Sequence, residues 1–290
     1  MEIKVPIVNA FVDGNVGGNP AGVVLDAQQF SHDQKRCIAA GVGLSETAFV
    51  SPSSIADYKL EFFTPTRQIA HCGHATIATF SYMKQLGMLN SDQTSKETVD
   101  GRREILMEGE YAFMEQLAPR YTYLSQADHL RAMAAIGLKA SDILEGVQPS
   151  IVNTGNSFLV IALRNQADVK SIVPIKAQIA TVSEIYDLIG FYIFSPQTTK
   201  GGRDAGARMF APRYGIDEES ATGMAAGPLA CYLHDKLNVK KNSFAIEQGY
   251  LMPQPSPSVI SVRLHKEDGS ISSLMAGGMA AVSEIRKVDC

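Results

Sequence analysis

Long apolar runs are absent from this 290-residue chain, which nowhere has the about 18 consecutive apolar residues that a membrane-spanning helix needs. Its first segment, MEIKVPIVNAF, predicts a strand and not a signal peptide, because it has no apolar core region and no cleavage site. Cysteine is scarce, and no two of Cys37, Cys72, Cys231 and Cys290 form a CxxC pair. Without a secretory signal we expect reduced thiols rather than a disulfide framework. These absences predict a cytoplasmic protein with no membrane partner.

Charge is also sparse. Only 19% of the residues are charged, the net charge is −4, and no long basic run occurs. A nucleic-acid partner is therefore not expected. Apolar residues make up 45% of the chain, which is ample for a packed core in one large domain or two of ordinary size.

The first half of the chain predicts alternating strands and helices. A short helix is expected after Ser31, which can form a capping box with Gln34, and a strand is expected in ETAFV. Extended segments are expected at 58–63, 104–107 and 111–117, with a polar loop at 90–103. A helix that is apolar on most faces follows Gly73, and Gly87 can end it. A domain boundary is expected near Pro119.

The second half predicts a helix from Ser125 to about Ile136, strands at 152–163 and 190–194, and a Gly- and Lys/Arg-bearing loop at 197–206. Another strand is expected in VISVRL, and the final segment AAVSEIRKV can return to the sheet of the first half. The predicted domains are therefore 1–117, joined by about 279–290, and 118–278.

Two segments of the chain echo each other. FFTPTRQIAHCGHATIATF and RMFAPRYGIDEESATGMAAGPLACYL both pass from an aromatic strand end through a proline turn and enter an apolar helix at a glycine. Cys72-Gly73-His74-Ala75 thereby aligns with Thr222-Gly223-Met224-Ala225. The repeat predicts two similar domains, each with a central helix. The N-termini of such helices can hold an anion.

Six segments, in this order, resemble the phenazine-biosynthesis PhzF-like isomerase family. They are GGNPAGVVL (17–25), LSETAFV (44–50), FFTPTRQIAHCGHATIA (62–78), NTGNSFLVIAL (153–163), RMFAPRYGI (208–216) and ATGMAAGPLACYL (221–233). The resemblance spans nearly the whole chain. It implies an α+β fold like that of diaminopimelate epimerase, with two pseudo-symmetric domains, each a curled, mostly antiparallel sheet around a central helix. It further implies an active site between the domains, no cofactor, no metal and, as in several members, a homodimer.

The same resemblance implies the catalytic residues. Glu46 matches the glutamate that takes a proton from carbon and returns it nearby, although its spacing alone favours a glutamate that faces water at a strand edge. Apolar neighbours would partly desolvate this carboxylate, which suits it to proton abstraction. His74 would bind substrate or assist the transfer. Without the resemblance, a first-turn histidine that caps or packs is an equal alternative.

A substrate carboxylate is expected at Gly73, Thr222 and Gly223, where backbone N–H groups can approach a ligand closely. The alternative is that these residues only let the two helices pack tightly. Cys72 matches one of the two thiols of related amino-acid epimerases, but the position of the other thiol holds Thr222. A two-thiol racemase is therefore disfavoured, and we expect Cys72 to be a small residue at a turn beside the substrate.

Two positions depart from the family pattern. Glu219 stands where the family has a substrate-contacting aspartate and is included among the catalytic candidates, and Met224 replaces a serine that can bind substrate. The departures leave Glu46 untouched but argue against the phenazine precursor as the substrate.

A zinc site formed by His71, Cys72 and His74 is not expected, because three ligands within four residues cannot easily surround one ion. We take His71 as structural.

The chain is thus predicted to be a cofactor-independent isomerase that moves a proton on a small carboxylic acid. The alternative is a binding protein or sensor that holds a small carboxylate without turnover, which the departures at Glu219 and Met224 would favour.

Overall fold

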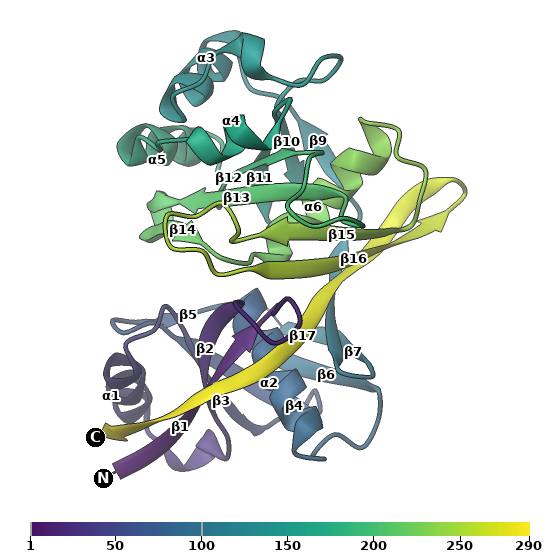
Figure 1. The fold of residues 1–290 in the computed structure, drawn as a ribbon. Helices are drawn as coiled ribbons and strands as arrows, with labels where there is room; N and C mark the ends of the chain where they lie inside the picture. The colour runs from purple at the N-terminus through teal and green to yellow at the C-terminus, as the bar shows by residue number, and fades with distance from the viewer. Residues whose placement is uncertain (1, 100) are drawn as a thin grey trace. The chain divides into compact units, whose positions relative to one another are not determined.

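The computed structural model describes residues 2–99 and 101–290, and the chain separates into two compact units. Unit 1 comprises Met1–Glu115 and Gly277–Cys290, and unit 2 comprises Gln116–Ala276 (Figure 1). The fold is mixed α+β, and each unit combines paired strands with helices.

Unit 1 is built from the first part of the chain and its last strand. Its elements are β1 (Glu2–Ala10), β2 (Asn19–Val24), α1 (His32–Val42), β3 (Thr47–Pro52), β4 (Tyr58–Phe63), β5 (Gln68–Ile69), α2 (Gly73–Gln85), β6 (Gln93–Thr98), β7 (Gly101–Glu108), most of β8 (Tyr111–Leu117) and most of β17 (Ser270–Asp289). The last strand, β17, runs antiparallel to β1, with Val5 opposite Arg286.

Unit 2 contains the remaining elements. They are β9 (Arg120–Thr122), α3 (Gln126–Ala135), β10 (Ser150–Asn153), β11 (Ser157–Ala162), α4 (Gln166–Ser171), α5 (Lys176–Ile185), β12 (Gly190–Ser195), β13 (Ala205–Ala211), β14 (Ile216–Glu219), α6 (Gly223–Asp235), β15 (Ser243–Gln248) and β16 (Ser258–Glu267). Helix α6 is buried along nearly its whole length and packs against β10, β11 and β16.

The same succession of strand pairings occurs in both units. In unit 1, β1–β2 is antiparallel, β2–β3 parallel, β3–β4 antiparallel, β4–β6 parallel and β6–β7 antiparallel. In unit 2, β10–β11, β11–β12, β12–β13, β13–β15 and β15–β16 follow the same order of directions. Helix α2 precedes β6 in one succession, and α6 precedes β15 in the other. The two segments that echo each other in the sequence therefore occupy the same place in each succession.

Each unit buries helices against its strands. Helix α2 packs on β1, β2 and β3, and it is buried on most sides because its residues are apolar or small nearly all round. Helix α1 contributes Ile38 and Val42 to a separate apolar cluster with Phe49, Phe63 and Val288. In unit 2, α3, α4 and α5 contribute to another apolar cluster that includes residues of β11, β12 and β13.

Several predicted elements are confirmed, and two are wrong. The capping box of α1, the strand at 58–63 and the helix that starts at Gly73 occur as expected. The segment 90–103 is not a loop: it contains β6 and the start of β7, and the buried polar side chains of β6 are held by hydrogen bonds such as Ser95 Oγ to Asp57 Oδ2 at 2.8 Å. The predicted strand 152–163 is two strands, because the chain turns at Gly155, whose φ of 116° favours glycine.

The prediction of four reduced thiols is wrong for one pair. Cys37 of α1 and Cys290 form a disulfide with their Cα atoms 6.0 Å apart, while Cys72 and Cys231 are free and buried. The spacing of the cysteines in the sequence does not predict this disulfide, because 253 residues separate the two partners. It becomes possible because β17 returns to β1 and brings Val288 into the cluster beneath α1.

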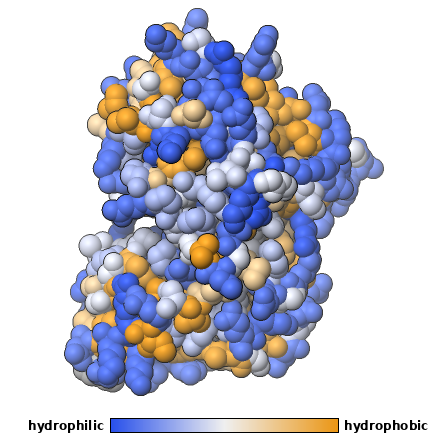
Figure 2. Space-filling view, viewed as in Figure 1, coloured by the Kyte–Doolittle hydropathy of each residue, from blue (hydrophilic) through white to orange (hydrophobic). Residues whose placement is uncertain are grey.

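None of the helices in the described ranges 2–99 and 101–290 combines the length and the apolar character needed to cross a bilayer. The face in Figure 2 carries hydrophilic side chains with apolar ones in scattered groups. Such scattering is ordinary for a globular protein surface.

Candidate active site

Glu46 lies at the start of β3, directly before Thr47, and is 7% exposed. Its backbone carbonyl accepts a hydrogen bond from the N–H of Gly22, which fixes it beside β2. Its Oε2 atom is buried, and among the described residues it has no hydrogen-bond partner. Burial of a carboxylate oxygen without such a partner costs free energy, which points to a functional role for this side chain.

Cys72 and His74 lie close to this carboxylate. His74 Nε2 is 3.3 Å from Glu46 Oε2, an ion-pair distance whose alignment is not that of a hydrogen bond. Cys72 Sγ is 3.6 Å from His74 Nδ1 and 4.0 Å from His74 Nε2. One donor atom from each of the three residues lies within 4.8 Å of the others, and all three residues are buried. The sequence resemblance named these residues separately, and the structure brings them together.

Burial is the largest influence on the Cys72 thiol and raises its pKa; His74 opposes this effect, and Glu46 adds to it. The thiol is therefore protonated near neutral pH. A protonated thiol is not a base, so Cys72 is a poor candidate for proton abstraction from carbon.

His71 is turned to a different neighbour. Its Nδ1 lies 3.4 Å from the Nζ of Lys96 on β6, and its ring meets the edge of Phe62. Burial, followed by the charges of Lys96 and Arg103, holds the pKa of His71 well below its ordinary 6.5. His71 is therefore neutral near pH 7. It contacts Lys96 and Phe62, which agrees with a structural role.

Lys96 was not predicted as a residue of interest, because it lies in the segment expected to be a loop. Its side chain is fully buried, donates a hydrogen bond to Thr76 Oγ1 at 2.6 Å and lies over the Phe62 ring. It thus places a cationic group next to the first turn of α2. No local pattern in QTSKET signals this burial.

The start of α6 holds the other predicted residues. Thr222 is its N-cap, and the Thr222 hydroxyl donates to Glu219 Oε2. The backbone N–H of Thr222 donates to Gln248 Oε1 at 3.0 Å, so this group already has an internal acceptor. An incoming anion would therefore meet the N–H groups of Gly223 and Met224 rather than that of Thr222.

Gln248, at the end of β15, is a positioning residue that no sequence pattern predicted. Its Nε2 donates to the Glu219 carbonyl at 2.7 Å and to Thr222 Oγ1 at 3.1 Å, while its Oε1 also accepts from the Tyr192 hydroxyl at 2.9 Å. The side chain thus fixes β14 against the start of α6. Only the pairing of β15 with β13 and β16 brings it there.

Met224 is half-buried, and its sulfur accepts a hydrogen bond from Asn156 Nδ2 at 3.5 Å. The thioether is a weak acceptor and donates nothing. This position therefore lacks the hydroxyl donor that the family pattern provides.

Helices α2 and α6 differ from three other helices of the chain at their first turns. Ser31, Ser125 and Asn165 cap α1, α3 and α4 with their side chains, whereas Cys72 and Thr222 make no such bond for α2 and α6. Helix α5 also lacks a side-chain cap, but it starts at the exposed Lys176, where water can bind its N–H groups. The uncapped starts of α2 and α6 are largely buried, which leaves them suited to a bound anion.

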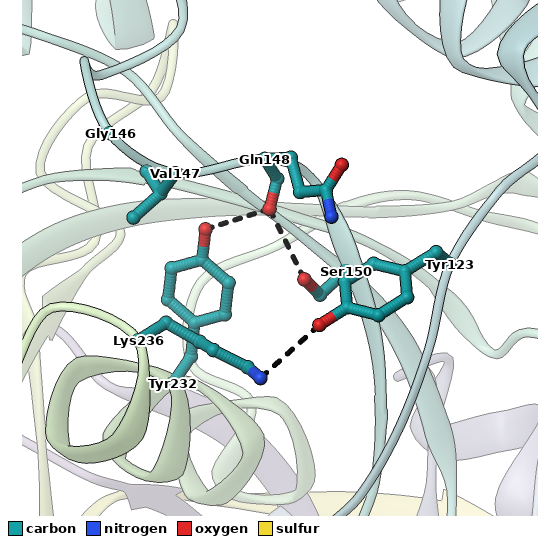
Figure 3. A pocket seen from close by; sticks show the side chains of 7 residues that line it. All are labelled: Tyr123, Gly146, Val147, Gln148, Ser150, Tyr232 and Lys236. Atoms are coloured by element: carbon teal, nitrogen blue, oxygen red, sulfur yellow. Dashed lines mark hydrogen bonds between the residues drawn. The ribbon is translucent and has the colours of Figure 1, made fainter.

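A separate cavity of about 370 Å³ lies at the end of α6 in unit 2 (Figure 3). Lys236 Nζ donates to the Tyr123 hydroxyl at 3.2 Å, and the Tyr232 hydroxyl donates to the Gln148 carbonyl at 2.8 Å. Burial raises the pKa of the Tyr232 hydroxyl, so it stays protonated. None of the seven residues that line the cavity carries a carboxylate or was predicted as a site residue.

The mixed α+β fold matches that of solved members of one family. The Bacillus anthracis phenazine biosynthesis protein of the PhzF family superposes with a TM-score of 0.91 at 24% identity, covering 100% of both chains. Residues 8–285 match the family described as phenazine biosynthesis-like protein, and the chain belongs to that family.

Curated relatives are named isomerases, and the chain is an enzyme of this class. The uncharacterized isomerase YddE of Escherichia coli O157:H7 is 33% identical over 241 residues, covering 80% of each chain. Trans-2,3-dihydro-3-hydroxyanthranilate isomerase of Pseudomonas chlororaphis is 29% identical over 259 residues, covering 86% of this chain and 87% of the relative.

Proposed function

We propose that this protein is a cofactor-independent isomerase that moves a proton on a small carboxylic acid, with Glu46 as the general base. The observation that carries the proposal is the Glu46 carboxylate, which is buried, has an oxygen without a hydrogen-bond partner among the described residues, and lies 3.3 Å from His74. A buried carboxylate in contact with an imidazole is placed to take up a proton from a substrate carbon that comes within hydrogen-bonding reach.

The reaction proceeds in two proton transfers. Glu46 accepts a proton from a carbon next to an electron-withdrawing or conjugated group, and the electron pair of the broken C–H bond moves into that group. The proton then returns from Glu46, or from His74 after exchange along their contact, to a different carbon. The number of protons and electrons is unchanged, so no redox partner is needed.

The substrate's own carboxylate is a negative group that the first turn of α2 in unit 1, or separately that of α6 in unit 2, would favour. Each of these first turns has the positive end of a helix dipole, which favours an anion, and the one of α2, which carries His74 next to Glu46, would also stabilise charge that develops during proton abstraction. The hydroxyanthranilate named for the Pseudomonas relative is such an acid. Because Met224 offers no hydroxyl and Glu219 is engaged with Thr222, we infer that this chain prefers a different acid.

Deuterium exchange tests the proposal. The protein is incubated in heavy water with a panel of small unsaturated, hydroxy and amino acids that includes trans-2,3-dihydro-3-hydroxyanthranilate, and incorporation at carbon is followed by mass spectrometry. Glu46→Gln should abolish exchange with any acid that the unaltered protein exchanges. Glu115→Gln, an exposed glutamate of the same unit, should exchange normally. Full exchange in Glu46→Gln would refute the proposal.

A binding protein without turnover is the second candidate, favoured by the apolar Met224 at the family's serine position. Its signature would be thermal stabilisation by an acid of the panel with no deuterium incorporation at any carbon. Exchange that depends on Glu46 would exclude it.

Cytoplasmic location, homodimer formation and the lack of nucleic-acid or membrane partners remain predictions from the sequence.

A further inference from the structure

We propose that Glu46, Cys72 and His74 form a binding site for a thiophilic divalent cation, with Zn²⁺ as its test ligand, and that the bound cation inhibits the enzyme. The binding statement is independent of the proposed function. The inhibition statement rests on it, because a cation on the Glu46 carboxylate would occupy the group that accepts the substrate proton.

The donor atoms lie close to where a zinc ion would need them. Zn–S, Zn–N and Zn–O bonds of about 2.0–2.3 Å at tetrahedral angles place ligand atoms about 3.3–3.6 Å apart. His74 Nε2 and Glu46 Oε2 are 3.3 Å apart, and Cys72 Sγ is 4.0 Å from the same nitrogen. All three donor atoms lie within 4.8 Å of one another, so a rearrangement of the Cys72 side chain towards the other two would complete the three-ligand arrangement.

The buried Glu46 oxygen is a second observation that favours a ligand at this point. Its side chain is 10% exposed, and its Oε2 accepts no hydrogen bond from the residues described. A cation at this point would supply the interaction that the oxygen lacks.

Cysteine sulfur, imidazole nitrogen and carboxylate oxygen together favour Zn²⁺ over Mg²⁺ or Ca²⁺, which prefer oxygen ligands. Three protein ligands leave a fourth position for water or substrate. As the S–Zn bond forms, the S–H bond of Cys72 breaks and its proton passes to solvent, so no oxidant or reductant is involved.

The residues that could bind zinc in the structure differ from the set His71, Cys72 and His74 considered in the sequence. Three ligands within residues 71–74 would crowd one ion, but the structure directs His71 to Lys96 and supplies Glu46 from the start of β3. Ligands from two separate segments can surround an ion without that crowding.

Binding is measured on protein freed of metal by a chelator, with Zn²⁺ titrated against a chromophoric competitor. Cys72→Ser should weaken Zn²⁺ binding at least about tenfold, since loss of even an outer-shell partner typically costs that much. Cys231→Ser, which alters the other free buried thiol, should bind as the unaltered protein does. Unchanged affinity in Cys72→Ser would overturn the proposal, as would the absence of any binding.

Cobalt gives a readout that does not depend on affinity or activity. The Co²⁺ protein should show a thiolate-to-cobalt charge-transfer band, which Cys72→Ser should lose and Cys231→Ser should keep. If Cys72→Ser proves unfolded by circular dichroism, His74→Gln replaces it and should shift the visible cobalt bands; unshifted bands would refute the site.

Inhibition is scored separately in the deuterium-exchange assay, where Zn²⁺ should suppress exchange and a chelator should restore it. Exchange that persists with Zn²⁺ bound refutes inhibition. Exchange that persists in Glu46→Gln refutes the proposed function, while the binding result stands on its own.

Discussion

The side-chain carbonyl of Gln248 accepts the backbone N–H of Thr222 at 3.0 Å, so the first turn of α6 is fixed by a residue on β15. We expect Gln248→Leu to lower the free energy of unfolding by about 2–4 kcal/mol, because the Thr222 N–H and the Tyr192 hydroxyl would be buried without an acceptor. Urea titration of the variant measures this loss. Gln254→Leu, at an exposed glutamine, is the control and should change little. Equal stability of the two variants would contradict this role.

His74 should matter for the reaction more than for the fold. We expect His74→Asn to slow deuterium exchange by about 10²-fold or more if the imidazole relays the proton, the usual range for a group in acid/base catalysis. Circular dichroism should show an unchanged fold, and the exposed His265→Asn should exchange normally. An exchange rate within a few-fold of normal would make His74 a packing residue, the alternative that the sequence left open.

The depressed pKa of His71 predicts a pH dependence of stability. Burial and Lys96 keep the folded-state pKa well below the ordinary 6.5, so below pH 6.5 the unfolded chain binds a proton that the folded protein does not. This histidine therefore lowers the free energy of unfolding as pH falls from 6.5 towards the folded-state pKa, with a slope approaching about 1.4 kcal/mol per pH unit.

Urea titrations at several pH values measure how the free energy of unfolding changes with pH. In His71→Gln this slope should decrease by up to about 1.4 kcal/mol per pH unit, the contribution of one proton. An unchanged slope in His71→Gln would show that His71 titrates normally. The exposed His265→Gln serves as the matched control.

The disulfide makes a prediction about both thiol count and stability. Unreduced protein in denaturant should expose two reactive thiols, Cys72 and Cys231, and reduction should raise the count to four. Reduction should lower the free energy of unfolding by about 2–4 kcal/mol, because Cys37–Cys290 restrains the unfolded chain. Cys37→Ser should show the lower stability with or without reductant. Four reactive thiols before reduction would show that the bond does not form.

The sequence allowed prediction wherever a local rule was at work. The Ser31–Gln34 capping box and the apolar helix that follows Gly73 could be predicted because each depends on neighbouring residues. Contacts over long distances could not. Lys96 is buried only because β6 pairs with β4, Gln248 reaches Thr222 only through the order of strands, and Cys37 meets Cys290 only because β17 returns to β1.

In the candidate active site, too, the residue types could be predicted from the sequence but their contacts could not. The resemblance identified Glu46, Cys72 and His74 one at a time, but their mutual distances depend on how the segment before β3 meets the start of α2. The spacing of the residues within each segment does not contain that information. The catalytic and binding roles of these residues, and of Glu219, therefore remain predictions for the experiments above.

Met224 gives the sharpest test of substrate preference, because it stands where the family pattern has a serine. Met224→Ser would replace a weak sulfur acceptor with a hydroxyl that can donate and accept, and it would release Asn156 Nδ2 from its 3.5 Å contact. We expect the variant to exchange trans-2,3-dihydro-3-hydroxyanthranilate about tenfold faster relative to an acid of similar size without a hydroxyl, since one hydrogen bond is worth about 1 kcal/mol or more. The ratio of the two exchange rates removes any general loss of activity. Met88→Ser, at an exposed methionine, should leave the ratio unchanged. A constant ratio in Met224→Ser would mean that this residue does not contact the part of the substrate that carries the hydroxyl, and the inferred preference for a different acid would lose its support.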